Sequence, residues 1–430
     1  MKRPDFFSPS PSGEGLGWGT LHPRVQSHRK RDCPTPTPPP RGRGFILPLA
    51  LLLTAAAAPP PPQPVVVTPG YQPQDADERG LWMQVDEVER QFKTSNFVIR
   101  DAALNAYVRQ VFCKTVGEAE CKDVRIYIVR TAYFNASMAP NGMMQVWSGL
   151  FLRTRNEAQL AAILGHEYTH YRNRHSVRSF RDIKAKTNAA AWLSIIPVGG
   201  WIGAGIGLAS LGMVGTIFAN SREMEREADS GSLPMLAKAG YDPAAASKVW
   251  AQILAEDAAT EAERKRKKSR EGGMFATHPT SIQRQAELDK QAKVLASPAA
   301  TALNVSEYRA ALAPWWADFV DDQIKLNDFG ATELLLGQLA DGNWTGELLY
   351  ARGELYRSRG KPEDFKAAAG YYREAVAKIG APVEAWRGLG VALLRSGDTP
   401  GGQAAIKTYL EKKPDAKDKS MMAMMAGVTS

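Results

Sequence analysis

Apolar residues recur along the chain in patterns that predict both helices and strands. Helical spacing predicts a helix over residues 76–92, followed by a second helix that Asp101 is placed to cap. Residues 124–129 alternate as a strand, and residues 135–138 and 143–147 predict two more strands on either side of a Pro-Asn-Gly turn. A small sheet is therefore expected before the next helical segment.

That next segment contains the pattern His166-Glu167-x-x-His170 within an amphipathic helix. Histidines four residues apart lie on one helix face, so both imidazoles can reach a single metal ion. A carboxylate beside such a site, here Glu167, can take a proton from water whose pKa zinc has lowered. The five-residue pattern also arises by chance, but in this helical context it predicts one Zn²⁺ per chain and a zinc peptidase.

A third protein ligand is needed to complete a two-histidine zinc site that leaves one position open for water. Glu225 and Asp229 are four residues apart and share a helix face, so one could bind the metal while the other accepts a hydrogen bond from a ligand histidine. A solvated, glutamate-rich helix face is the alternative. His175 is a rival ligand, but it lies about 140° around the helix from His170, and the chain would have to turn back. We interpret His175 as structural.

Two other features are candidates for handling the substrate. His278 could donate to a developing oxyanion or occupy the open position of the metal, and a histidine at a helix start is the alternative. Asn135 and Ala136 begin a strand whose open edge could pair with an extended peptide. A hairpin that only completes the core is the alternative for that strand.

The formal charge of +9 comes mostly from the start of the chain. The first 58 residues hold eight Lys/Arg and three Asp/Glu, so the remaining residues carry 46 basic and 42 acidic side chains. This near balance argues against a nucleic-acid partner.

The first 75 residues indicate export. Residues 45–58 are apolar, follow two arginines and end in small residues, as in a signal peptide cleaved near Ala58. Residues 1–44 are rich in Pro, Gly and Ser, and we interpret them as a disordered extension or a misassigned translation start. Residues 59–75 begin as a Pro-rich linker. The predicted location is the periplasm, with membrane association left open.

Cys113 and Cys121 are the cysteines that remain after the predicted cleavage. Their close spacing and an oxidising compartment favour a local disulfide, and two unpaired buried thiols are the alternative.

Residues 187–221 contain a long stretch without charge that glycines and a proline interrupt. Its length could cross a membrane, but its small residues also suit a packed segment over an active site. We favour a buried lid, or one with peripheral membrane contact, over a transmembrane hairpin.

Residues 301–430 are expected to form an all-α, tetratricopeptide-like domain. After residue 330, small and aromatic residues recur at positions that fit two helix pairs, with a degenerate pair before them. Such repeats present a concave surface to extended peptides or partner proteins, and a plain helical cap is the alternative.

Taken together, these motifs resemble the HtpX- and BepA-type gluzincin metallopeptidases. The similarity covers about residues 76–295, in the family's order and spacing. It rests on the following segments: Asn135-Ala136 through Gly149-Leu150, the His-Glu-x-x-His helix, Ser221-Arg222 with Glu225-x-x-Ala228-Asp229, and His278-Pro279 with Arg284.

The resemblance assigns roles that the residues alone left open. It implies that His166, His170 and Glu225 bind zinc and that Glu167 is the general base. Asp229 and Arg222 would then lie just outside the ligands. It also implies an α+β zincin catalytic domain, mostly helical with a small sheet, over residues 76–300.

The sequence thus predicts an exported zinc endopeptidase that acts in protein quality control on misfolded or unassembled envelope polypeptides. Its C-terminal repeats would contact the outer-membrane assembly machinery. Two alternatives remain: an assembly chaperone or scaffold with residual proteolysis, and a membrane-embedded quality-control protease. Natural substrates, cleavage specificity and oligomeric state are beyond the sequence.

Overall fold

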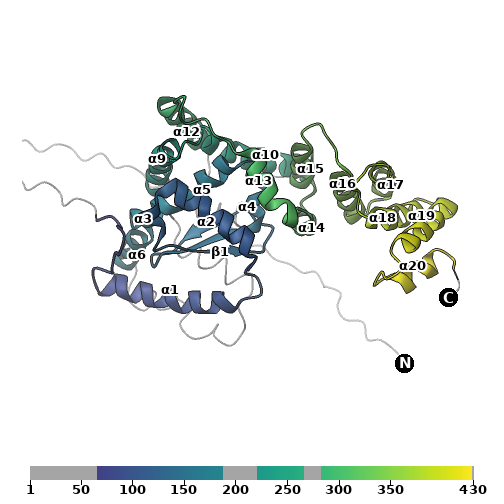
Figure 1. The fold of residues 1–430 in the computed structure, drawn as a ribbon, viewed down its shortest axis with the longest axis horizontal. Coiled ribbons are helices and arrows are strands. Elements are labelled where there is room, and N and C mark those ends of the chain that lie inside the picture. The colour runs from purple at the N-terminus through teal and green to yellow at the C-terminus, as the bar shows by residue number, and fades with distance from the viewer. Residues whose placement is uncertain (1–64, 187–219, 266–281, 429–430) are drawn as a thin grey trace, which may run out of the picture. The chain divides into compact units, whose positions relative to one another are not determined.

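The computed structural model describes residues 65–186, 220–265 and 282–428. This part of the chain is mostly helical with one small sheet, which confirms the predicted α+β class (Figure 1). The predicted signal peptide, the uncharged stretch up to residue 219, and His278 lie outside the described residues. No helix within the described ranges is long and apolar enough to cross a membrane.

The sheet has three strands in the order β1-β3-β2, so β2 lies at an edge. The strands are β1 (Arg125–Val129), β2 (Ala136–Met138) and β3 (Met143–Trp147). The parallel partner of β3 is β1, and its antiparallel partner is β2. All three coincide with predicted strands, and Gly142 at φ +88° closes the expected turn between β2 and β3 with a backbone bond to Ala139.

Helices cover both faces of this sheet, and the strand alternation explains which residues face each layer. Tyr127 and Trp147 pack with Phe92 of α1 on one face. Ile128 and Val146 belong to the large core on the other face, toward α2 and α5 (Figure 1). The helices around the sheet are α1 (Ala76–Thr94), α2 (Ala102–Val116), α3 (Glu118–Cys121), α4 (Ser148–Arg153), α5 (Glu157–Arg172) and α6 (His175–Lys186).

The chain then adds helices that pack beside α5 and continue to the C-terminus. They are α9 (Arg222–Lys238), α10 (Ala245–Arg264), α12 (Ile282–Leu295), α13 (Val305–Leu312), a 3₁₀ turn (Ala313–Trp315), α14 (Trp316–Lys325), α15 (Phe329–Ala340), α16 (Gly346–Arg359), α17 (Pro362–Val376), α18 (Glu384–Arg395), α19 (Thr399–Lys412) and α20 (Lys419–Met425).

The C-terminal helices form consecutive pairs over the stretches predicted as repeats. The pairs α16/α17 and α18/α19 share a core in which Tyr372 is fully buried. A Cβ added at Gly353 or Gly388 would come within 2.6 or 2.5 Å of the Tyr372 ring. Glycine at these positions therefore allows both helices to close around one aromatic ring. The helical content agrees with the prediction, while the tetratricopeptide assignment stays a prediction.

One core connects the sheet layer with the first of these C-terminal helices. The largest apolar cluster contains Leu160 of α5 and Trp250 of α10, and it also contains Phe319 of α14, Leu335 of α15 and Leu355 of α16. A buried polar contact lies in the same region, where Arg153 of α4 pairs with Glu256 of α10. We therefore expect α10, α14 and α15 to stabilise the layer that holds α5.

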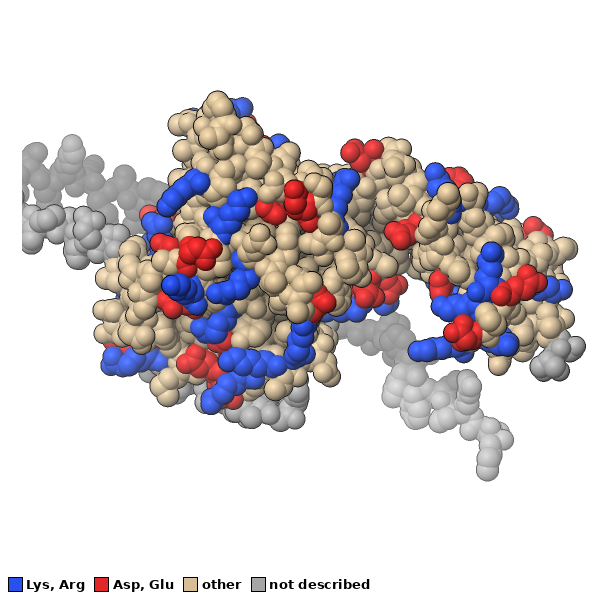
Figure 2. All heavy atoms as spheres, in the orientation of Figure 1, with Lys and Arg blue, Asp and Glu red and all other residues tan. Residues whose placement is uncertain are grey.

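Basic and acidic side chains are interspersed over the face of the described residues shown in Figure 2. This distribution agrees with the near balance of charge beyond the leader.

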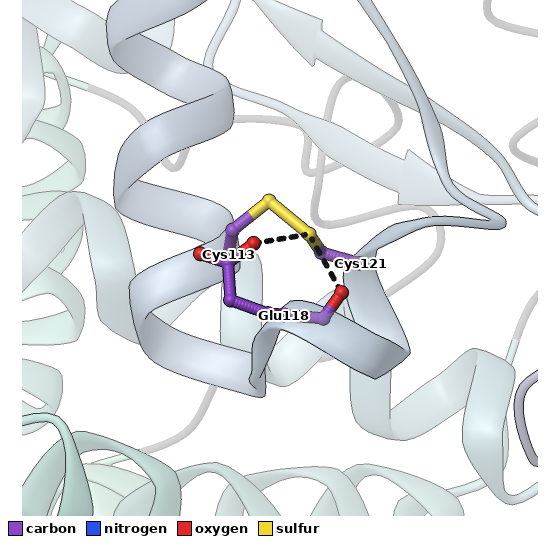
Figure 3. A group of neighbouring side chains, drawn as sticks. All are labelled: Cys113, Glu118 and Cys121. Atoms are coloured by element: carbon purple, nitrogen blue, oxygen red, sulfur yellow. Dashed lines mark hydrogen bonds between the residues drawn. A yellow bond between two sulfur atoms is a disulfide. The ribbon is translucent and has the colours of Figure 1, made fainter.

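A disulfide joins Cys113, near the end of α2, to Cys121 at the end of α3 (Figure 3). The cysteines are eight residues apart, and both are buried. The bond forms the local loop that the sequence favoured, and it fixes the last turn of a helix that packs against α5.

We expect a Cys113→Ala/Cys121→Ala variant to unfold with a free energy about 2–3 kcal/mol lower than the wild type, because the unfolded chain loses a closed loop. Urea denaturation with and without a reductant measures this. Reductant should lower the wild type to the level of the double variant and leave the variant unchanged. A wild type that is equally stable with and without reductant would contradict the prediction.

Candidate active site

Helix α5 carries the His-Glu-x-x-His segment through the centre of the core. Asn156 caps the helix, because its side chain accepts a hydrogen bond from the Gln159 backbone N–H at 2.9 Å. Residues 157–171 are all buried, so the helix is covered on every side. His166, Glu167 and His170 are each at most 3% exposed. The motif is thus shielded from bulk water, which strengthens electrostatic interactions within it.

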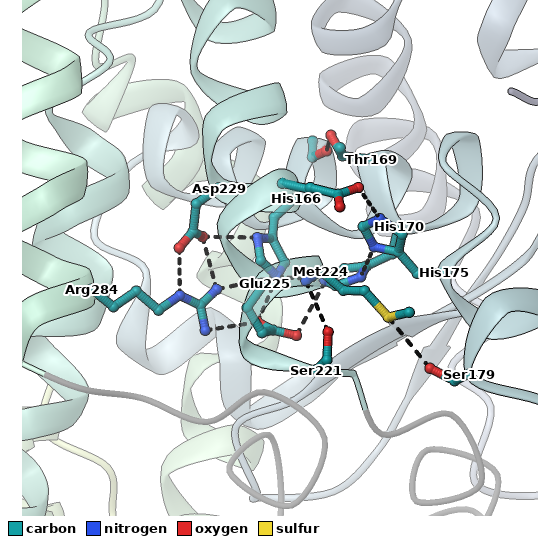
Figure 4. Close-up of polar contacts among 12 residues, drawn as sticks. His166, Thr169, His170, His175, Ser179, Ser221, Met224, Glu225, Asp229 and Arg284 are labelled. Atoms are coloured by element: carbon teal, nitrogen blue, oxygen red, sulfur yellow. Dashed lines mark hydrogen bonds and ion pairs between the residues drawn. The ribbon is translucent and has the colours of Figure 1, made fainter. Parts of the chain in front are cut away.

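Helix α9 packs closely on α5 and supplies acidic side chains to the histidine face. Ser221 caps α9 through the Met224 backbone N–H. A Cβ added at Gly231 would lie 2.6 Å from a methyl carbon of Thr169, so glycine permits the close approach of the two helices. The register of this contact places Glu225 and Asp229 beside His166 (Figure 4).

His166, His170 and Glu225 form a buried group of three potential metal ligands. The two Nε2 atoms are 3.0 Å apart, and the Glu225 carboxylate oxygens lie 3.5 Å from Nε2 of His166 and 3.4 Å from Nε2 of His170. Tetrahedral zinc, with bonds of about 2.0–2.2 Å, separates its ligand atoms by about 3.3–3.6 Å. Both distances to Glu225 fall in this range, while the 3.0 Å between the histidine nitrogens is slightly below it. The donor types suit zinc, because two histidines with a glutamate are a known catalytic donor set.

The formal charges of the group also suit a divalent cation. Glu167, Glu225 and Asp229 are buried carboxylates, and Arg284 is the buried cation that contacts two of them. With neutral histidines, these described residues carry a formal charge of −2. Because buried uncompensated charge is costly, a dication would stabilise this arrangement.

Asp229 contacts His166, the first histidine of the candidate ligand group. Its Oδ1 lies 3.0 Å from Nδ1 of His166, on the side of the ring opposite Nε2. Burial would raise the pKa of Asp229, but Arg284 and His166 hold it below its ordinary value. Burial likewise disfavours a charged His166, yet Asp229 and Glu225 raise its pKa to about 9. A metal ion binding at this Nε2 would therefore compete with a proton.

Arg284 of α12 anchors the two carboxylates, a role that could not be predicted from its place in the family motif. It binds both oxygens of Asp229, at 2.5 and 2.8 Å, and its Nη1 lies 2.8 Å from Glu225. The guanidinium also stacks on the ring of Trp250, 4.1 Å from the ring centroid. Burial lowers the pKa of Arg284, but the carboxylates of Asp229, Glu225 and Glu167 raise it above its ordinary value. Helix α10, through Trp250, thus supports the acidic half of the site.

His175 approaches His170 because the chain turns back after α5. Arg174 adopts a left-handed conformation with φ 55°, and α6 starts at the next residue. The Arg174 side chain is held by Glu78 of α1, at 3.1 and 2.5 Å. This turn places Nδ1 of His175 2.8 Å from Nδ1 of His170. The metal-ligand group described above does not include His175.

The remaining predicted site residues lie in different surroundings. Arg222 is exposed in the first turn of α9, apart from the buried ligands. Asn135 and Ala136 are buried at the start of β2, the edge strand that lies beside α5. His278 is outside the described residues.

A buried two-histidine helix with a glutamate between the ligands, an acidic helix packed on it, and an adjacent edge strand define a metallopeptidase of the zincin class. Residues 100–292 match the model of peptidase family M48. Over these residues the chain is similar to peptidase family M48, and this similarity confirms the resemblance to HtpX- and BepA-type metallopeptidases.

Three relatives agree with this assignment. The putative beta-barrel assembly-enhancing protease of Vibrio cholerae is 29% identical over 204 residues, which are 45% of this chain and 40% of that protein. The beta-barrel assembly-enhancing protease of Escherichia coli K12 is 26% identical over 223 residues, 50% of this chain and 44% of that protein. The mitochondrial metalloendopeptidase OMA1 of Schizosaccharomyces pombe is 27% identical over 186 residues, 43% of this chain and 52% of that protein. The chain thus spans about half or less of each relative.

Proposed function

We propose that this chain is an exported zinc-dependent endopeptidase that cleaves misfolded or unassembled envelope proteins. The observation that carries the proposal is the buried group of His166, His170 and Glu225 with Glu167 on the same helix. When bound, the ion would lower the pKa of a water molecule and polarise the scissile carbonyl. Names of two relatives, which are beta-barrel assembly-enhancing proteases, support the proposed client class.

Glu167 performs the proton transfers in this mechanism. It follows His166 directly, so on α5 its side chain projects about 100° around the helix from His166 and about 60° from His170. Its carboxylate takes a proton from the attacking water and later gives that proton to the leaving amine. Glu225 and the two histidines would hold the ion, while the contacts of Asp229 and Arg284 keep His166 and Glu225 in place.

Strand β2 would hold the substrate in an extended conformation. The carbonyl of Asn135 and the N–H of Ala139 bond to β3, so by alternation the polar backbone groups of Ala136 and Met138 point to the outer edge. An extended peptide can add to such an edge. The Oδ1 atom of Asn135 is buried and has no hydrogen-bond partner among the described residues. It is therefore available to accept from a substrate N–H.

We expect the purified full chain to cleave unfolded casein and to lose this activity in 1,10-phenanthroline. Added Zn²⁺ should restore cleavage, because metal removal leaves the three ligand residues and the general base intact. The non-chelating isomer 1,7-phenanthroline is the matched control and should leave the activity unchanged. Cleavage that persists in protein shown by metal analysis to be metal-free would refute a zinc mechanism.

The consecutive C-terminal helix pairs favour a second candidate function, an assembly chaperone or scaffold that holds clients on residues 301–430. Rescue of an outer-membrane assembly defect separates the two functions. Equal rescue by wild type and Glu167→Gln would favour the scaffold, and rescue by wild type alone would favour the protease.

A further inference from the structure

The Nδ1 atoms of the two proposed ligand histidines have different partners. Nδ1 of His166 meets the Asp229 carboxylate directly, and Asp229 is bound by Arg284. Nδ1 of His170 instead contacts another imidazole, that of His175. The carboxylate on this side, that of Glu227, reaches His170 only through His175.

Both ring nitrogens of His175 have partners, and the ring is fully buried. Nδ1 lies 2.8 Å from Nδ1 of His170, and Nε2 lies 3.0 Å from Oε2 of Glu227 on α9. Glu227 is in turn bound by Arg178 of α6, with an Nη1–Oε2 distance of 2.8 Å. Figure 4 shows the His175 side chain directed at His170.

The direction of the hydrogen bonds follows from the metal site. If Nε2 of His170 binds the metal, its ring proton would be on Nδ1, so this nitrogen would donate and Nδ1 of His175 would accept. The remaining proton of neutral His175 is then on Nε2, from which it is donated to the Glu227 carboxylate. Each group thus has one permitted role, and the chain of contacts selects the tautomer of His170 that presents a lone pair to the metal.

We propose that His175 is a positioning residue for the metal site, which accepts the Nδ1 proton of His170 and connects this ligand through Glu227 to Arg178. This inference rests on the proposed zinc site. It gives each ligand histidine a carboxylate–arginine support: Asp229 and Arg284 for His166, and Glu227 and Arg178, through His175, for His170. Such outer partners hold a ligand in its binding orientation before the metal arrives.

Zinc affinity of the full chain, measured by competition with a chelating indicator, tests the proposal with three variants of His175. The Asn side chain places an amide near the position of Nδ1 of His175, and the Gln side chain places one near the position of Nε2. The Phe side chain has no polar group at either position. We expect His175→Phe to weaken zinc binding about 10- to 100-fold. His175→Asn should recover binding to within about 5-fold of the wild type, because it restores the acceptor for His170, and His175→Gln should stay close to Phe.

Thermal melting of the metal-free proteins shows whether a His175 variant has lost zinc affinity because the core packs less well or because His170 is no longer held in position. Because Glu227 is partly exposed, Glu227→Gln tests the same contacts without altering the core, and it should also weaken zinc binding. Glu223→Gln, an equivalent change at an exposed residue of the same helix, should not. His175→Phe within 2-fold of the wild type, or Asn and Phe weakened equally, would overturn the proposal. A wild type that binds no zinc would instead overturn the proposed function itself.

Discussion

Glu167→Gln is expected to bind one zinc per chain and melt like the wild type, while its kcat for casein cleavage falls by about 10²- to 10⁴-fold. The substitution retains the size of the side chain and removes the carboxylate that transfers protons. The ligands His166, His170 and Glu225 are unchanged, so metal content should be unchanged as well. Metal analysis, thermal melting and single-turnover cleavage measure the three quantities on one preparation.

The matched control for this variant is Glu223→Gln, which makes the same chemical change at an exposed position on α9. It should retain full activity. Cleavage by Glu167→Gln at the wild-type rate would refute the assigned general base. Loss of both zinc and activity would instead show that Glu167 acts mainly on the structure of the site.

Glu225→Ala is expected to weaken zinc binding by more than about 100-fold and so to abolish cleavage. This loss is larger than the one expected when a residue that only contacts a ligand is removed. The variant removes one of three ligands and leaves Arg284 paired with Asp229. Equilibrium competition for zinc measures the change. Glu223→Ala, two residues away on the same helix, is the control and should bind zinc like the wild type.

A full equivalent of tightly bound zinc in Glu225→Ala would contradict the ligand assignment. The neighbouring His175 would then be the residue to test as the third ligand, although both of its ring nitrogens are engaged by His170 and Glu227 in this structure.

Local patterns in the sequence predicted much of the fold. The strand at residues 125–129 follows from alternation, and the strands at residues 136–138 and 143–147 follow from the turn between them. Asp101 caps a helix as its side chain allows. The histidine pair is also local, because two residues four apart share a helix face. Interactions of this kind depend on neighbours along the chain, so they can be recognised without tertiary structure.

The rest of the site depends on contacts between distant segments. The pairing of Asp229 with Arg284 joins residues 55 positions apart, and Trp250 supports Arg284 from a helix whose start the sequence did not reveal. The role of His175 depends on a left-handed conformation at Arg174, a non-glycine residue that no local pattern marks. For this reason His175 could be interpreted from the sequence only as a rival ligand or a structural residue.

The most direct test of the central claim is a zinc-edge anomalous difference map of Glu167→Gln crystals grown with zinc. We predict one strong peak bounded by Nε2 of His166, Nε2 of His170 and the Glu225 carboxylate, at about 2.0–2.2 Å from each. A peak that is not in contact with Glu225 would contradict the account. The absence of a peak in crystals of fully active wild-type protein would contradict it as well.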